Sequence, residues 1–277
     1  MLLDLVSPWC AAVEATNSPR AQQGFRTRHA QLLELLRRQR SPLTHGLPLE
    51  TRLDTLRILA QRAADPAGQQ RLRDLLASAT ALGADGCARV VLLAGDGTGF
   101  TAEPLPWPDG DVGLFLDRAD DERSVAVALA RSVAALTRWR AADSASAVRR
   151  LAGAAWDRWE AAREIPLREW IYTAGVGLHL ARLLIPATAP HELLGVSRTG
   201  LSRLRQRERF LRTLLTNDLE SCGVGLVLRW LAPGTPAGPR TVGGTILPPM
   251  AGRYLAWRMV EERVNRVGVR DAIRMPS

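Results

Sequence analysis

The chain has 277 residues, of which 46% are hydrophobic and 23% charged, the composition of a globular protein large enough to bury its own core. No segment approaches the roughly 20 apolar residues of a membrane-spanning helix, and acidic Asp4 lies where a signal peptide is basic, so we expect a cytoplasmic protein with no membrane association. The formal charge of +9 comes from arginine alone, because the sequence contains no lysine. These arginines are dispersed, which favours a solvated surface over a polyanion-binding one.

Leucines at helical spacing predict three helices in the first third of the chain. The first begins at Ser18, an N-cap residue followed by proline, and runs to about residue 40. The second covers 48–63, and the third follows Pro66. We assign residues 1–85 to an N-terminal helical region.

Two short apolar runs then interrupt the helical pattern. Residues 89–94 predict a strand that ends in the glycine-rich turn 95–99, and residues 112–116 predict a second strand after the proline-rich loop 104–108. A phosphate-binding loop would need a helix directly after the glycines. Because prolines follow instead, we interpret this segment as a plain turn.

Long apolar helical patterns return after the second strand. They predict helices over 121–139, 143–163, 167–184 and 199–220, and a last helix from residue 251 after a Pro/Gly-rich loop. We therefore expect an α+β fold that is predominantly helical, with a small β-sheet packed among long helices. Residues 86–277 would form the second region, continuous with the first.

Three segments of this second region stand in an order that is found in a known family. Residues 124–139, SVAVALARSVAALTRW, follow the predicted strand; residues 166–186, PLREWIYTAGVGLHLARLLIP, form the next helix; and residues 249–260, PMAGRYLAWRMV, open the last. This order resembles a family of predicted bacterial zinc-dependent proteases of the gluzincin type. The resemblance implies a metalloprotease-like domain with an HExxH helix, a second helix whose EGLA-like motif supplies a ligand, and a closing helix whose tyrosine faces the cleft.

Every metal-binding position of that family carries an unsuitable residue in this chain. The HExxH motif falls on Ala128, Leu129 and Ser132, and the EGLA glutamate falls on Ala174. Zinc binding needs histidine, cysteine or carboxylate ligands, and the proteolytic reaction needs a general base. The four histidines of the chain are also too far apart in sequence to form a zinc motif. We therefore expect no metal, no cofactor and no zinc-protease activity.

The leading hypothesis is a pseudoenzyme that binds a peptide or protein partner in the former active-site cleft. Its candidate binding residues are Arg131, His179, Arg253 and Tyr254. A second hypothesis is a repurposed, metal-independent enzyme for a small molecule or modified peptide, with His179 and Tyr254 as candidate catalytic residues. A structural histidine is the simpler interpretation of His179, because its helix is mostly apolar.

A third hypothesis is DNA binding by the arginine-rich segment 190–209, which resembles a helix-turn-helix. Its residues for phosphates and base edges would be Ser197, Arg198, Thr199 and Arg203. Against it, a bulky His191 lies where the two helices need a small residue. The later arginines also alternate along the helix and so spread around it.

Overall fold

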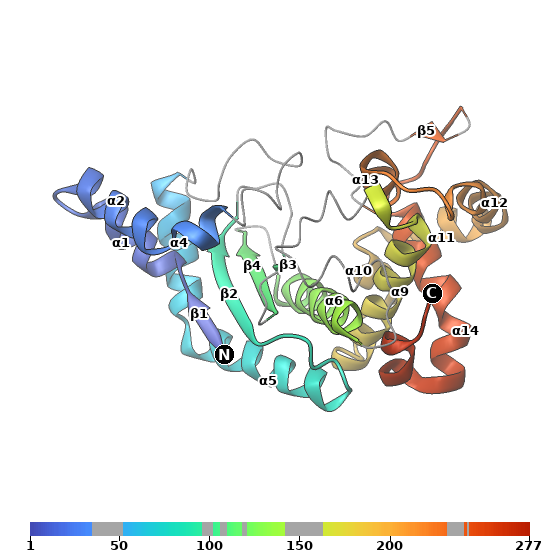
Figure 1. Cartoon of the computed structure of the whole chain (residues 1–277), viewed down its shortest axis with the longest axis horizontal. Helices are drawn as coiled ribbons and strands as arrows, with labels where there is room; N and C mark the ends of the chain where they lie inside the picture. Colours follow the sequence, from blue (N-terminus) through green and yellow to red (C-terminus); the bar gives the residue numbers. More distant parts are fainter. Residues whose placement is uncertain are drawn as a thin grey trace.

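The computed structural model describes residues 1–34, 52–95, 102–105, 110–117, 121–141, 163–231, 241–242 and 244–277. Within these ranges the protein is predominantly helical, with a small sheet among long helices, as the sequence predicts (Figure 1). The predicted helix over 143–163 and the turn over 95–99 lie almost wholly outside the described residues. None of the described helices is both long and apolar enough to cross a membrane.

A four-stranded sheet forms the centre of the N-terminal half. Its strands, in spatial order, are β1 (Leu2–Asp4), β2 (Arg89–Ala94), β4 (Asp111–Leu116) and β3 (Ala102–Leu105). Strands β1, β2 and β4 are parallel, with Val90 of β2 between Leu2 and Val112, and β3 runs antiparallel to β4. Strands β2 and β4 are buried almost throughout, as expected for parallel strands that are covered on both faces.

Two strands of this sheet were not predicted, and neither were two short strands, 241–242 and 245–246, within the predicted Pro/Gly-rich loop. Strand β1 has only three residues, too few for a sequence pattern, and it forms by pairing with β2. Strand β3 includes Pro104, which the sequence assigned to a loop, and which pairs with Val112. A proline is tolerated there because β3 is an edge strand, where one side of the backbone needs no partner.

The N-terminal helices surround this sheet. They are α1 (Val6–Glu14), α2 (Ser18–Arg28), α4 (Leu53–Ala64) and α5 (Pro66–Ala81). The predicted first helix is interrupted, because His29 leaves helical geometry (φ −111°, ψ 20°) directly after α2. Residues 30–34 are helical again, and the rest of the predicted helix lies outside the described residues. Asp65 separates α4 from α5, and its carboxylate caps α5 by accepting hydrogen bonds from the amides of Ala67 and Gly68.

Three long helices build the C-terminal half: α6 (Glu122–Arg140), α9 (Leu167–Leu184) and α14 (Ala251–Arg274). Helix α6 contacts β3, β4 and α5 as well as α9, and therefore joins the sheet to the helical half (Figure 1). Buried residues of both predicted regions belong to one hydrophobic cluster.

Shorter elements complete this half. They are α10 (Pro190–Leu194), α11 (Arg198–Gln206), α12 (Glu208–Asp218), α13 (Val224–Leu231), β5 (Thr241–Val242) and β6 (Thr245–Ile246). The predicted single helix over 199–220 is therefore wrong, because the backbone breaks at Arg207 (φ −100°, ψ 6°) between α11 and α12.

Candidate functional site

The three helices that carry the predicted site lie together, with α9 between α6 and α14. A Cβ atom on Gly177 would lie 2.9 Å from the Cα atom of Arg131 in α6. A Cβ atom on Gly175 would lie 2.3 Å from the carbonyl oxygen of Ala256 in α14. Both distances are shorter than van der Waals contact, so the helix backbones touch where only glycine fits. A peptide cannot lie between helices in backbone contact.

The predicted site residues are accordingly buried. Those with at most 5% of their surface exposed are Leu129, Ser132, His179 and Tyr254. Those that are half-buried are Ala128, Arg131, Ala174 and Arg253. The side chains that the sequence assigned to a cleft are therefore buried or half-buried where these helices pack, and Tyr254 is packed between α12 and α14.

His179 connects α9 to α14. Its Nε2 atom lies 3.0 Å from the carbonyl oxygen of Trp257, and because a carbonyl only accepts, Nε2 carries the proton and donates it. Burial lowers the pKa of His179 below its ordinary value, although the bond to the Trp257 carbonyl acts in the opposite direction. This environment holds a neutral imidazole in a structural hydrogen bond.

Tyr254 belongs to a polar cluster between α12 and α14. Its hydroxyl donates a hydrogen bond to the carboxylate of Glu208, which also receives bonds from Arg212 at 2.9 and 3.0 Å. Burial, followed by the interaction with Glu208, raises the pKa of Tyr254 to about 12. The phenol is thus a hydrogen-bond donor that joins the two helices, and it is not poised to act as a base.

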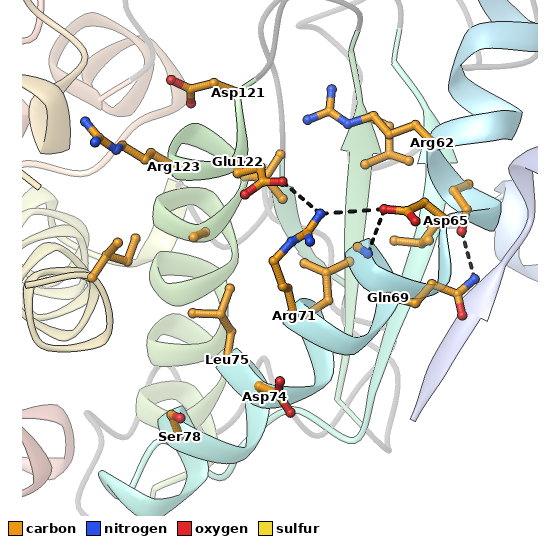
Figure 2. Close-up of a pocket in the computed structure, with 18 residues that line it drawn as sticks. Arg62, Asp65, Gln69, Arg71, Asp74, Leu75, Ser78, Asp121, Glu122 and Arg123 are labelled. Atoms are coloured by element: carbon orange, nitrogen blue, oxygen red, sulfur yellow. Dashed lines mark hydrogen bonds and ion pairs between the residues drawn. The ribbon is translucent and has the colours of Figure 1, made fainter. Parts of the chain in front are cut away.

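A cavity of about 730 Å³ lies elsewhere, between α5 and α6 (Figure 2). Leu92 of β2 and Leu116 of β4 reach it from the carboxyl-terminal halves of two parallel strands, the edge where α/β sheets most often bind ligands. Its volume is in the range of known ligand sites. The other apolar residues that line it are Ala63, Leu72, Leu75, Val125, Ala126 and Ile185.

Charged side chains at the rim of this cavity are already paired within the chain. Arg71 of α5 lies 2.7 Å from Glu122 and 3.6 Å from Asp65, and so bridges the two helices (Figure 2). Arg123 pairs with Glu192 of α10 at 2.8 Å.

The two aspartates at the rim serve as helix caps. The carboxylate of Asp65 caps α5, and that of Asp121 accepts a hydrogen bond of 2.6 Å from the amide of Ser124 at the start of α6. An anionic ligand therefore meets carboxylates, not free amides, at these helix N-termini.

Sequence reasoning did not find this cavity. The caps Asp65 and Asp121 are visible in the sequence, but they indicate helix starts and not a site. The cavity arises from the placement of α5 and α6 over the sheet, and that placement depends on the pairing of β2 with β4.

The segment proposed for DNA binding has the expected turn. Gly195 follows α10 in the left-handed conformation (φ 67°, ψ 38°), and α11 begins after Ser197, whose hydroxyl accepts a hydrogen bond from the amide of Gly200. The side chains of Arg198, Thr199 and Arg203 are exposed. However, α10 has only five residues, because proline occupies its first position.

In the part of the chain that the structure describes, no three histidine, cysteine, aspartate or glutamate side chains are grouped closely enough to hold a metal ion. Comparison of the chain with protein-family models, with characterised proteins and with solved structures finds no match.

Proposed function

We propose that this protein is a non-proteolytic binding protein whose cavity between α5 and α6 accepts a segment of a peptide or protein partner. The observation that carries the proposal is the elongated shape of the site. Its lining positions on α5 run from Asp65 to Ser78 along one helix face, which corresponds to about 20 Å. That length accommodates about six residues of extended chain or between about three and four turns of a helix.

The chemistry of the lining favours an apolar stretch of partner. Arg71, Arg123, Asp65 and Asp121 already have partners within the chain, so a ligand gains little by displacing them. Leu75 and Ile185 are the half-buried apolar residues of the lining, and their remaining exposed surface gains free energy when it is covered. A peptide with apolar side chains at helical or alternating spacing fits this arrangement.

The resemblance to zinc proteases supports the pseudoenzyme part of the proposal through Ala128, Leu129, Ser132 and Ala174. It does not support a binding site at those residues, because the helices there are in backbone contact. The same burial argues against the alternative of a repurposed enzyme that uses His179 and Tyr254.

Selection from a random peptide display library on the immobilised full chain tests the proposal. Peptides rich in apolar residues should be recovered, and we expect Leu75→Glu to weaken their binding about tenfold or more, because it places a charge on the cavity surface. Leu76→Glu is the matched control: Leu76 is the neighbouring residue, equally half-buried, and does not line this cavity.

Fluorescence anisotropy of a selected peptide measures both variants, and circular dichroism confirms that each is folded. Equal weakening by Leu75→Glu and Leu76→Glu would show that the peptide binds elsewhere. Recovery of peptides with no apolar preference would contradict the proposed chemistry.

A further inference from the structure

Helix α11 and the start of α12 carry exposed arginines for which the structure records no ion pair with a carboxylate among the described residues, although Arg198 is near enough to Glu192 to add to the lowering of that carboxylate's pKa by the Ala189 amide. Their exposed arginines are Arg198, Arg203, Arg205, Arg207 and Arg209. Among the residues that the structure describes, none of these five guanidinium groups makes an ion pair or a hydrogen bond. Some other exposed arginines of the helical half are paired, such as Arg123 with Glu192 and Arg168 with Glu220, both at 2.8 Å.

The one acidic residue within this run does not neutralise it. Glu208 is directed at α14, where it accepts a hydrogen bond from Tyr254 and lies 3.5 Å from Arg258. Burial opposes ionisation of Glu208, but the hydrogen bonds from Tyr254 and Arg212 and the nearby arginine charges outweigh it and lower its pKa. The five arginines therefore leave positive charge around α11 and the start of α12 that needs counterions from solution.

An exposed aromatic ring adjoins this surface. Phe210 follows Arg209 in α12 and has 47% of its surface exposed, which costs solvation free energy unless a partner covers the ring. We name the five arginines together with Phe210 the α11–α12 surface. Figure 1 shows these two helices at the end of the molecule opposite α1 and α2.

We propose that the α11–α12 surface binds single-stranded nucleic acid. Guanidinium groups match phosphate geometry, and an aromatic ring beside them can stack on a base, the combination that single-strand-binding proteins use. This inference is independent of the peptide site, because the α5–α6 cavity lies on other elements.

The geometry favours a single strand over a duplex. Leu201 and Leu204 bury one side of α11, while Arg203 and Arg205, two positions apart, diverge on the exposed side. A flexible strand can follow such a curved surface, whereas a rigid duplex meets only part of it. The five-residue α10 is also short for the helix that crosses the DNA backbone in a helix-turn-helix.

Anisotropy of a fluorescein-labelled oligothymidine, titrated with the full chain over a range of salt concentrations, tests this proposal. Each phosphate contact contributes about −0.7 to the slope of log K against log salt for single strands. The triple variant Arg203→Gln, Arg205→Gln, Arg207→Gln should therefore reduce the magnitude of that slope by about 2. Phe210→Ala should weaken binding by about fivefold or more through lost stacking, with the slope unchanged.

A second triple variant, Arg20→Gln, Arg28→Gln, Arg52→Gln, removes the same charge from exposed arginines outside this surface and should leave the slope unchanged. If both triple variants reduced the salt slope equally, the proposal would be overturned, because net charge alone would then explain binding. Tighter binding of a duplex of equal length, or equal competition by polyglutamate, would also overturn it. Leu75→Glu should bind oligothymidine as tightly as the unmodified chain. A failure of the peptide-site proposal can then be told apart from a failure of the nucleic-acid proposal.

Discussion

The buried ion pair between Arg138 of α6 and Glu169 of α9 provides the sharpest test of how the helical half is held together. The Arg138 side chain is only 2% exposed and that of Glu169 7%, and their closest N–O distance is 2.6 Å. The Arg138 guanidinium carbon also lies 4.2 Å from the ring centre of Tyr172. Its Nη1 atom donates hydrogen bonds to the carbonyls of Ile273, in the last turn of α14, and Met275, directly after it.

Removing one partner leaves the other charge buried and uncompensated. We expect Glu169→Leu, and separately Arg138→Met, to lower the free energy of unfolding by about 3–5 kcal/mol each. Replacing both with apolar side chains removes the two desolvation costs together and is often neutral. In the double variant the carbonyls of Ile273 and Met275 lose their hydrogen bonds from Arg138, and each loss lowers the free energy of unfolding by about 1 kcal/mol. The double variant should therefore lose only about 2 kcal/mol, less than either single variant.

Urea unfolding at pH 7, followed by tryptophan fluorescence and by circular dichroism, measures these changes. The surface pair Arg168–Glu220, 2.8 Å apart with side chains 44% and 68% exposed, supplies the control. Glu220→Leu should cost less than about 1 kcal/mol. If Glu169→Leu costs no more than Glu220→Leu, or if the losses of Arg138→Met and Glu169→Leu simply add in the double variant, the reasoning is refuted.

Two further predictions concern the interface of α9 and α14. Gly175→Ala should lower the free energy of unfolding by about 1–3 kcal/mol, because its Cβ would lie 2.3 Å from the Ala256 carbonyl oxygen. The control Gly24→Ala in α2, where a Cβ has nothing within 4 Å, should raise the free energy of unfolding by about 0.5–1 kcal/mol. Urea unfolding measures both variants, and equal effects would contradict the close approach of α9 and α14. The pKa of His179 is lower in the folded than in the unfolded chain, so the unfolded chain binds a proton first as pH falls below about 6.5. The free energy of unfolding should therefore decrease by up to about 1.4 kcal/mol per pH unit until pH reaches the folded pKa. His179→Gln should flatten this dependence between pH 7.5 and 5.5, and an unchanged slope would show that another group causes it.

Both proposals place binding at surfaces away from the interface that the protease resemblance suggested. The groove along α5 and the arginine surface of α11 and α12 belong to different elements, so each can be disabled separately. The proposed peptide site is apolar with paired charges, and the proposed nucleic-acid site is basic, with arginines that form no ion pairs within the described residues. The double use of a peptide groove and a nucleic-acid surface would make the chain an adaptor between the two kinds of partner.

Elements with strong local signals could be predicted from the amino-acid sequence. The predicted strand 89–94 and helix 167–184 agree with β2 and α9, and the helix predicted over 121–139 lies within one residue of α6. These segments have long apolar periodicity, and Asp121 and Pro166 mark where helices begin. Such signals act between neighbours in the chain and require no knowledge of the fold.

The remaining features depend on contacts between residues that are distant in the sequence. The pairing of β1 with β2 joins residues far apart in sequence, and Pro104 became part of a strand because an edge position was available. Gly175 and Gly177 occur in a helix where the sequence gives no reason for them, and they bring α9 into contact with two other helices. These long-range contacts bury His179 and Tyr254 and leave the cavity between α5 and α6. The surroundings of a side chain depend on the elements that pack against it.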